Sequence, residues 1–178
     1  MNKFPRSAYI HIPFCHRRCF YCDFAVVPLG DKVEPLKGYG SQTVKEYLHI
    51  LFKEILSIKH KAPLSTIYLG GGTPSILDPK QIEDLINLFK ENYGVDYGAE
   101  ITMEVDPASF NEQDLYGFIN AGVNRFSLGA QSFNNQILKN AGRRHLREDV
   151  EKSCLWLKKV LDLGLINSWS LDLIQNLP

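Results

Sequence analysis

Strand-like and helix-like segments alternate along the whole chain, and this alternation limits the folds that it can adopt. The predicted strands are rich in β-branched and aromatic residues: SAYIHI (7–12), STIYLG (65–70), AEITMEV (99–105), VNRFSLG (123–129) and NSWSLDLI (167–174). A strand that is followed by a helix and by another strand forms a right-handed unit of a parallel sheet. The sequence therefore predicts an α/β fold with its functional residues at the carboxyl ends of parallel strands.

The helices between these strands are indicated by apolar stripes and by capping residues. Apolar residues at steps of three and four cover residues 44–56 and again residues 150–161. Asp78 and Asn111 are expected to be N-caps, each at the start of a further helix. A short helix is also expected over residues 134–139.

Three of the four cysteines, Cys15, Cys19 and Cys22, lie within YIHIPFCHRRCFYCDF (9–24), directly after the first predicted strand. The fourth, Cys154, lies on the apolar stripe of the last helix and is expected to be a small core residue. The chain shows neither a signal peptide nor a run of about 18 apolar residues, so a cytoplasmic location is expected. In a reducing compartment, a cysteine cluster is more often metal-binding or catalytic than disulfide-bonded.

The spacing C-x3-C-x2-C is compatible with two kinds of metal site. A structural zinc site needs four protein ligands, and here His11 or His16 would have to supply the fourth. Because His16 is adjacent to Cys15, it would strain such a tetrahedron. Three close thiolates suit a four-iron cluster better, since each thiolate can bind one iron while the fourth iron stays open. The spacing favours iron–sulfur, with zinc as the alternative.

The other strand ends carry residues with both a functional and an ordinary interpretation. GGGTPS (70–75) follows the second strand, where it can approach a ligand closely or form a tight turn. Glu104 and Asp106 end the third strand, and such acidic residues are often only solvated. AGRRH (141–145) can likewise be a solvated basic patch. With 20 basic and 20 acidic side chains, the chain shows no charge excess that would indicate a nucleic-acid partner.

Six segments together resemble the radical S-adenosylmethionine (SAM) superfamily, most closely the subgroup of HemW heme chaperones and oxygen-independent coproporphyrinogen III oxidases. They are YIHIPFCHRRCFYCDF, YLGGGTPSIL, MEVDPASF, NRFSLGAQSFN, AGRRH and SLDLI with the final LP. The resemblance implies a parallel (β/α) partial barrel of six units, followed by a C-terminal domain. Residues 1–178 are therefore expected to be a truncated radical SAM core with about five of the six units, the C-terminal domain being absent.

The resemblance also implies a cofactor site. Cys15, Cys19 and Cys22 match the ligands of a [4Fe-4S] cluster, and SAM would bind the open iron. The positions that match SAM-lining residues of the family are Tyr9, Tyr21, Gly71, Gly72, Thr73, Glu104, Gln131, Arg143 and Asp172. No catalytic residue is assigned.

Two functions within the subgroup are compatible with the chain, which leaves open whether it is an enzyme. The oxidases carry a further cysteine two residues after the third, where this chain has Phe24, and they have a longer segment before the motif. Both differences favour a heme chaperone over a coproporphyrinogen III oxidase. Expected partners are heme or a porphyrin, an electron donor and a heme-acceptor protein, which could be membrane-associated.

Two further points concern heme and the chain's last residues. The histidines that could bind heme stand in no convincing ligand motif, and they are His11, His16, His49, His60 and His145. The family usually has Tyr-Gly where this chain has Gln175 and Asn176, so the resemblance leaves the local backbone after the fifth strand open, although Asp172 is kept.

Overall fold

The computed structural model describes residues 4–30, 40–58 and 62–177. Its main element is one five-stranded sheet in the order β1-β4-β5-β6-β7, in which every neighbouring pair is parallel. The strands are β1 (Ser7–Ile12), β4 (Leu64–Gly71), β5 (Val95–Val105), β6 (Arg125–Gln131) and β7 (Ser168–Leu173). The predicted α/β class is confirmed, and the sheet is open rather than closed into a barrel.

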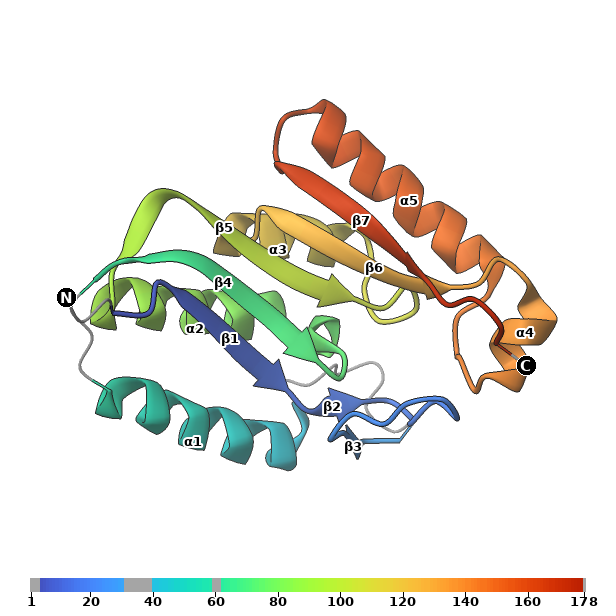
Figure 1. Cartoon of the computed structure of the whole chain (residues 1–178), viewed down its shortest axis with the longest axis horizontal. Coiled ribbons are helices and arrows are strands. Elements are labelled where there is room, and N and C mark those ends of the chain that lie inside the picture. Colours follow the sequence, from blue (N-terminus) through green and yellow to red (C-terminus); the bar gives the residue numbers. More distant parts are fainter. Residues whose placement is uncertain (1–3, 31–39, 59–61, 178) are drawn as a thin grey trace.

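Helices follow the strands as the alternation predicts, and they lie along one side of the sheet (Figure 1). Strand order follows chain order without a reversal, so right-handed crossovers place every helix on the same face. The helices are α1 (Gln42–Ser57), α2 (Pro79–Asn92), α3 (Glu112–Ala121), α4 (Asn135–Asn140) and α5 (Arg147–Asp162), with a short 3-10 helix η3 (Pro74–Ile76).

Side chains of the strands alternate between an apolar and a polar face. Ile67 and Leu69 of β4, and Met103 of β5, are almost completely buried toward the helices. The alternate positions include Tyr68 and Glu104, which point to the uncovered face and bond to each other there. Because successive side chains point to opposite faces of a strand, the apolar side chains form the core on one side of the sheet and the polar ones lie on the other.

The two predicted N-caps are confirmed, and both form capping boxes. Asp78 accepts from the N–H of Lys80, and its own N–H donates to Gln81 Oε1 at 3.0 Å. Asn111 and Asp114 make the reciprocal pair at the start of α3. These local bonds satisfy helix N–H groups that have no partner within the helix.

The limits of four strands differ from those predicted, by one residue at each end of β4 and β7 and by more at β5 and β6. Asn124 lies next to the predicted start of β6. Its side chain accepts from the N–H of Ile101 at 2.8 Å and donates to the carbonyl of Ala99 at 2.8 Å. Asn124 therefore bonds β5 through both its backbone N–H and its side chain, and β6 begins at Arg125, two residues after the predicted start. β5 itself starts four residues before the predicted Ala99, at Val95, which pairs with Leu64 across a register shift.

The short parallel pair of β2 (Phe14–Cys15) and β3 (Val27–Pro28) brackets the cysteine loop and was not predicted.

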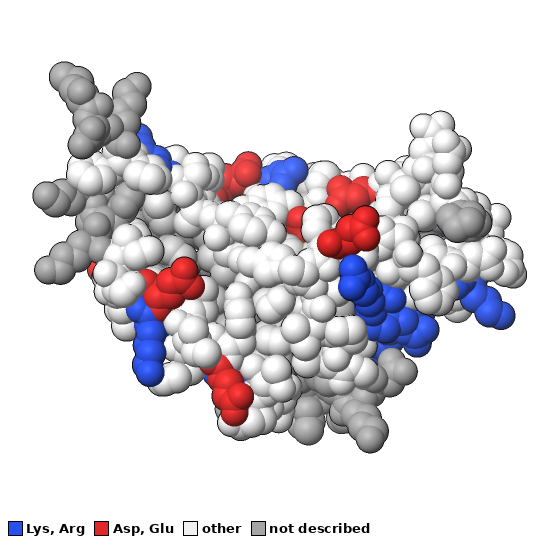
Figure 2. All heavy atoms as spheres, turned by 60° about the horizontal axis from the view of Figure 1, so that its bottom comes forward, with Lys and Arg blue, Asp and Glu red and all other residues white. Residues whose placement is uncertain are grey.

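On the face shown in Figure 2, acidic and basic side chains occur in small groups amid uncharged residues. Within the described ranges, no helix is both long enough and apolar enough to cross a membrane.

Two leucines of α5 give a matched test of this packing. Leu157 is completely buried and Leu155 is 68% exposed on the same helix. We expect Leu157→Ala to lower the free energy of unfolding by about 2–5 kcal/mol, because it leaves a cavity in the core. Leu155→Ala should change it by no more than about 0.5 kcal/mol. Urea denaturation measures both, and equal losses would contradict the observed orientation of α5.

Candidate cofactor site

A cavity of about 330 Å³ lies at the carboxyl ends of the strands, where the fold class predicts a site. It is bounded by the cysteine loop, the turn after β4 and the ends of β5, β6 and β7. All but one of the residues predicted for the site line this cavity: Cys15, Cys19, Tyr21, Cys22, Gly71, Gly72, Thr73, Glu104, Gln131, Arg143 and Asp172.

Tyr9 is the exception. It lies on β1 with its ring stacked on Tyr68, at a centroid distance of 5.9 Å, and it is 60% exposed. It lines a second cavity, between β1 and α1. Tyr9 therefore contacts Tyr68, which bonds the cavity residue Glu104, but Tyr9 does not line the cavity itself.

The cysteine loop is held at both of its ends and in its middle. The N–H groups of Leu29 and Gly30 donate to the carbonyls of Cys15 and His16, at 2.8 and 2.9 Å. In the middle of the loop, the N–H of Phe20 donates to the carbonyl of Ala141 at 3.0 Å. The loop is therefore anchored to a segment that lies far along the chain.

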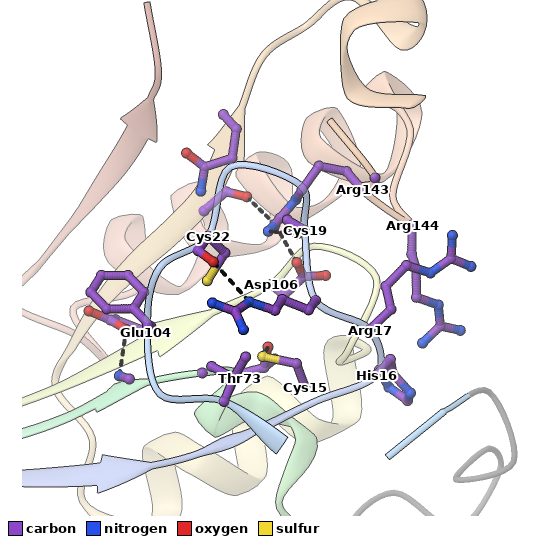
Figure 3. A pocket seen from close by; sticks show the side chains of 18 of the residues that line it. Cys15, His16, Arg17, Cys19, Cys22, Thr73, Glu104, Asp106, Arg143 and Arg144 are labelled. Carbon is purple, nitrogen blue, oxygen red and sulfur yellow. Dashed lines mark hydrogen bonds and ion pairs between the residues drawn. The ribbon is translucent and has the colours of Figure 1, made fainter. Parts of the chain in front are cut away.

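All four cysteines are free thiols, and the three of the loop face different sides of the cavity (Figure 3). Cys15 accepts from Thr73 Oγ1 at 3.4 Å, whereas Cys19 lies 3.6 Å from Arg143 Nη1. Burial raises the pKa of Cys15 to about 11, and the bond from Thr73 acts against this shift. A metal bound there would replace the thiol proton.

The cysteines are not arranged around one point. Among residues 4–30, 40–58 and 62–177, no three His, Cys, Asp or Glu side chains are close enough to hold a single metal ion. Thiols distributed around a cavity can each bind a different iron of a cluster. Cys154 is partly buried and packs against the core, as a small structural residue does.

The glycine turn after β4 closely approaches the cysteine loop. A Cβ atom on Gly72 would lie 2.7 Å from the carbonyl oxygen of Phe14 and 3.0 Å from Cys15 Sγ. Gly71 has a φ of +113°, a conformation that side chains rarely allow, and its N–H donates to Glu104 Oε2 at 3.1 Å. The turn is thus a backbone cradle between the sheet and the cysteines.

Two carboxylates project from the polar face of the sheet into the cavity. Glu104 also accepts from the Tyr68 hydroxyl at 2.9 Å. Burial raises the pKa of Glu104, an effect that the bonds from Tyr68 and Gly71 oppose. Asp172 accepts from Ser127 Oγ at 3.0 Å. These carboxylates can accept from hydroxyl groups and attract a cation.

The interpretation of AGRRH as a solvated basic patch is wrong for Arg143 and His145. Arg143 forms an ion pair with Asp106, and the two side chains are only 12% and 21% exposed. His145 is completely buried. Asp106 is therefore not merely solvated either: although burial alone would raise its pKa, the Arg143 cation holds the pKa of Asp106 well below its usual range.

Sequence reasoning missed this role of Asp106 and His145 because the ion pair at its centre joins Arg143 to a residue 37 positions earlier in the chain. The local signal was present, since Asp106 follows Glu104 at a strand end and His145 follows Arg143 by two residues. Of the other histidines, His11 contacts the carbonyl of Ala25 at 3.0 Å, and His49 is exposed on α1. His60 lies outside the described residues.

After β7, the structure shows the backbone conformation at the position where this chain departs from the family pattern. Asn176 has a φ of +62°, in the left-handed region that glycine adopts without strain and asparagine tolerates better than most residues. Asn176 stands where the family usually has glycine, so the substitution keeps an accessible turn. Gln131 has a φ of +65° at the end of β6, and its carbonyl accepts from Ile174.

Comparisons with known proteins agree with this geometry. Residues 9–168 match the model of the Radical SAM superfamily. A heme chaperone HemW from Synechocystis is 41% identical over 175 residues, which are 98% of this chain and 40% of the relative. An oxygen-independent coproporphyrinogen III oxidase from Salmonella typhimurium is 35% identical over 181 residues, which cover 98% of this chain and 36% of that protein.

A solved structure shows the same fold. Coproporphyrinogen III oxidase (HemN) from Escherichia coli, described as a Radical SAM enzyme, superposes with a TM-score of 0.81 and 31% identity, over 99% of this chain and 38% of that one. The chain spans about two fifths of the length of the proteins it matches. The family match extends from the first strand, through the cysteine loop, to the start of the last strand, so the chain belongs to the Radical SAM superfamily.

Proposed function

We propose that Cys15, Cys19 and Cys22 ligate a [4Fe-4S] cluster with SAM at its open iron, in a protein that binds and transfers heme as HemW-type chaperones do. The observation that carries this proposal is the convergence, around one cavity, of three free thiols with two carboxylates and the Arg143 cation. These groups come from four separate parts of the chain, which a structural zinc clip would not need. Cluster and SAM together would supply one-electron chemistry.

The chain's own groups fit the parts of SAM. Glu104 and Asp172 can accept from ribose hydroxyls and attract the sulfonium. The N–H groups of Gly71 and Gly72 are already bonded, to Glu104 and to Ile12, so this turn would contact the SAM ammonium through carbonyl oxygens. Arg143 has a buried Nε with no partner among the described residues, and this donor can take a carboxylate.

The chaperone is preferred to the oxidase on two grounds. The relative named heme chaperone HemW, at 41% identity, is more similar to this chain than the oxidase given above, at 35%. Phe24, which stands where oxidases have a further cysteine, lines the cavity and is 66% exposed, so it offers an apolar surface instead of a fourth thiol. The oxidase remains the second candidate because the HemN structure is so similar.

The proposal extends to partners and location. A heme chaperone requires heme, an acceptor protein that can be membrane-associated, and an electron donor if the cluster is reduced. A cytoplasmic location suits the three cysteines, because that compartment keeps thiols reduced. A sixth βα unit and a C-terminal domain are part of the proposed complete protein. Residues that handle the porphyrin are expected there rather than in this core.

The cluster ligands can be tested by anaerobic reconstitution with iron and sulfide. We expect about four irons per chain, since one such cluster holds four. Cys15→Ala, Cys19→Ala and Cys22→Ala should each abolish the cluster, and Cys154→Ala should leave it intact as a matched control. One equivalent of tight zinc, without a sulfide-dependent chromophore, would show that the metal assignment is wrong.

SAM binding can be tested on the reduced cluster by electron paramagnetic resonance (EPR). We expect SAM to change the spectrum because it coordinates the open iron. Glu104→Ala should weaken binding by about 1.5–3 kcal/mol, the contribution of one bond to a charged group. Glu100→Ala, four residues earlier on β5, should have no effect. An identical spectrum with and without SAM would contradict the open-iron site.

The choice between chaperone and oxidase rests on an anaerobic assay of the complete protein with reductant and SAM. We expect stable heme binding and no conversion of coproporphyrinogen III, because the additional thiol position is Phe24. Heme binding is measured by its absorption spectrum, and conversion by chromatography of the porphyrins. Protoporphyrinogen IX formed at catalytic turnover would reverse the order of the two candidates.

A further inference from the structure

We propose that Asp106 and His145 are positioning residues that fix the Arg143 guanidinium beside the cysteine loop, so that its charge acts on the group bound there. Asp106, His145 and the carbonyl of Gly129 are called the Arg143 clamp below. The inference rests on the proposed function, since it concerns how this chain treats the cluster and SAM. It goes further by giving roles to two residues that no part of that function used.

The two terminal nitrogens of Arg143 face different surroundings. Nη2 donates to Asp106 in the ion pair, to the carbonyl of Gly129 at 2.8 Å, and faces His145 Nδ1 at 3.3 Å. Nη1 instead faces the cysteine loop, at 3.6 Å from Cys19 Sγ and 3.4 Å from the Tyr21 hydroxyl. The clamp therefore holds one nitrogen against the ends of β5 and β6 and directs the other to the loop (Figure 3).

The partners of His145 assign its hydrogen. Nε2 lies 2.9 Å from the carbonyl of Ala130, which can only accept, so Nε2 carries the proton. Nδ1 lies 3.3 Å from Arg143 Nη2, which can only donate, and 3.7 Å from Asp106 Oδ2, so Nδ1 accepts by sharing one Nη2 hydrogen with the carboxylate. A neutral ring satisfies the contacts with Ala130 and Arg143, whereas a protonated one would set an N–H against the guanidinium, with Asp106 Oδ2 at 3.7 Å, beyond hydrogen-bond distance, as its acceptor. His145 is thus a buried acceptor with one function in the clamp.

Asp106 is fixed as firmly as His145. Its Oδ1 accepts from the N–H of Ala108 at 3.0 Å, and its own N–H donates to Ser75 Oγ at 3.0 Å. Ser75 in turn bonds Ser109, and both serines are buried. The carboxylate therefore cannot follow Arg143 if the guanidinium moves, and it sets the position of the cation.

The low exposure of the clamp makes the charge of Arg143 effective. With Arg143 at 12% and Asp106 at 21% exposed, water screens their fields less than at an open surface. A hydrogen-bond donor near a cluster sulfur stabilises the more negative, reduced state and raises the reduction potential. The same cation, with its unpartnered buried Nε, favours a bound carboxylate. Displacing Arg143 should weaken both effects.

Two variants of His145 separate positioning from simple support of the fold. In His145→Asn the amide oxygen can stand near the place of Nδ1 and still accept from Arg143. In His145→Gln the amide can reach the carbonyl of Ala130 but leaves Arg143 without this acceptor. Asp106→Asn keeps the shape of the carboxylate and removes its charge. All are compared in the reconstituted complete protein at equal iron content.

We expect the midpoint potential of the cluster, measured by EPR-monitored titration, to stay near the wild-type value in His145→Asn. It should become more negative in His145→Gln and in Asp106→Asn, with SAM binding weakened about tenfold in both, the loss expected from one contact to a charged group. In an Arg143→Gln background, His145→Gln should cause no further change, because the residue through which it acts is gone.

Several outcomes would overturn the clamp. The first is that wild type, His145→Gln and Asp106→Asn have equal midpoint potentials and equal SAM affinities. The second is that His145→Asn and His145→Gln lower both quantities equally. The third is that His145→Gln has its full effect in the Arg143→Gln background. If His145→Gln fails to fold, Asp106→Asn provides the same two readouts. A wild-type chain that binds no cluster would instead contradict the proposed function, so the two failures are distinguishable.

Discussion

Every crossover in this chain advances the sheet in the same direction, and the other properties of the structure depend on this constraint. Because a right-handed crossover leaves its helix on a fixed side, five strands in chain order have all their helices on one face. A doubly wound sheet would bury both faces of each strand. Here only one face is covered, and the strands can carry polar side chains on the other without burying them in an apolar core.

The register of the strands then determines which polar groups meet. Glu104 of β5 is level with Ser127 of β6, and Gly129 of β6 is level with Asp172 of β7. Negative charge thus collects on the sheet side of the cavity, while Arg143 enters from the segment after β6. A ligand with separate cationic and anionic ends can satisfy both sides, which is the charge distribution of a zwitterionic amino acid bearing a sulfonium.

Local patterns predicted the fold well because its signals are short-range. The capping boxes at Asp78 and Asn111 involve residues three apart, and the strands follow from runs of apolar and polar residues. The cysteine spacing and the strand-end motifs indicated most of the cavity wall for the same reason. The sequence did not predict individual side-chain contacts between segments that lie far apart in the chain. The Asn124 side chain adds bonds to β5 at the start of β6, and Asp106 meets Arg143 across 37 residues of chain.

The bond from Phe20 to Ala141 has a consequence for the order in which the site is completed. Cys19 and the Arg143 beside it are 124 residues apart, so a ribosome releases the cysteine loop long before the residues against which it rests. Until β6 has joined the sheet and α4 has formed after it, the middle of the loop lacks its anchor, Ala141. Closing so long a loop has an entropic cost that only the intervening strand pairs can offset. The nascent chain therefore exposes three thiols that are not yet sequestered, and during this period they are vulnerable to oxidation.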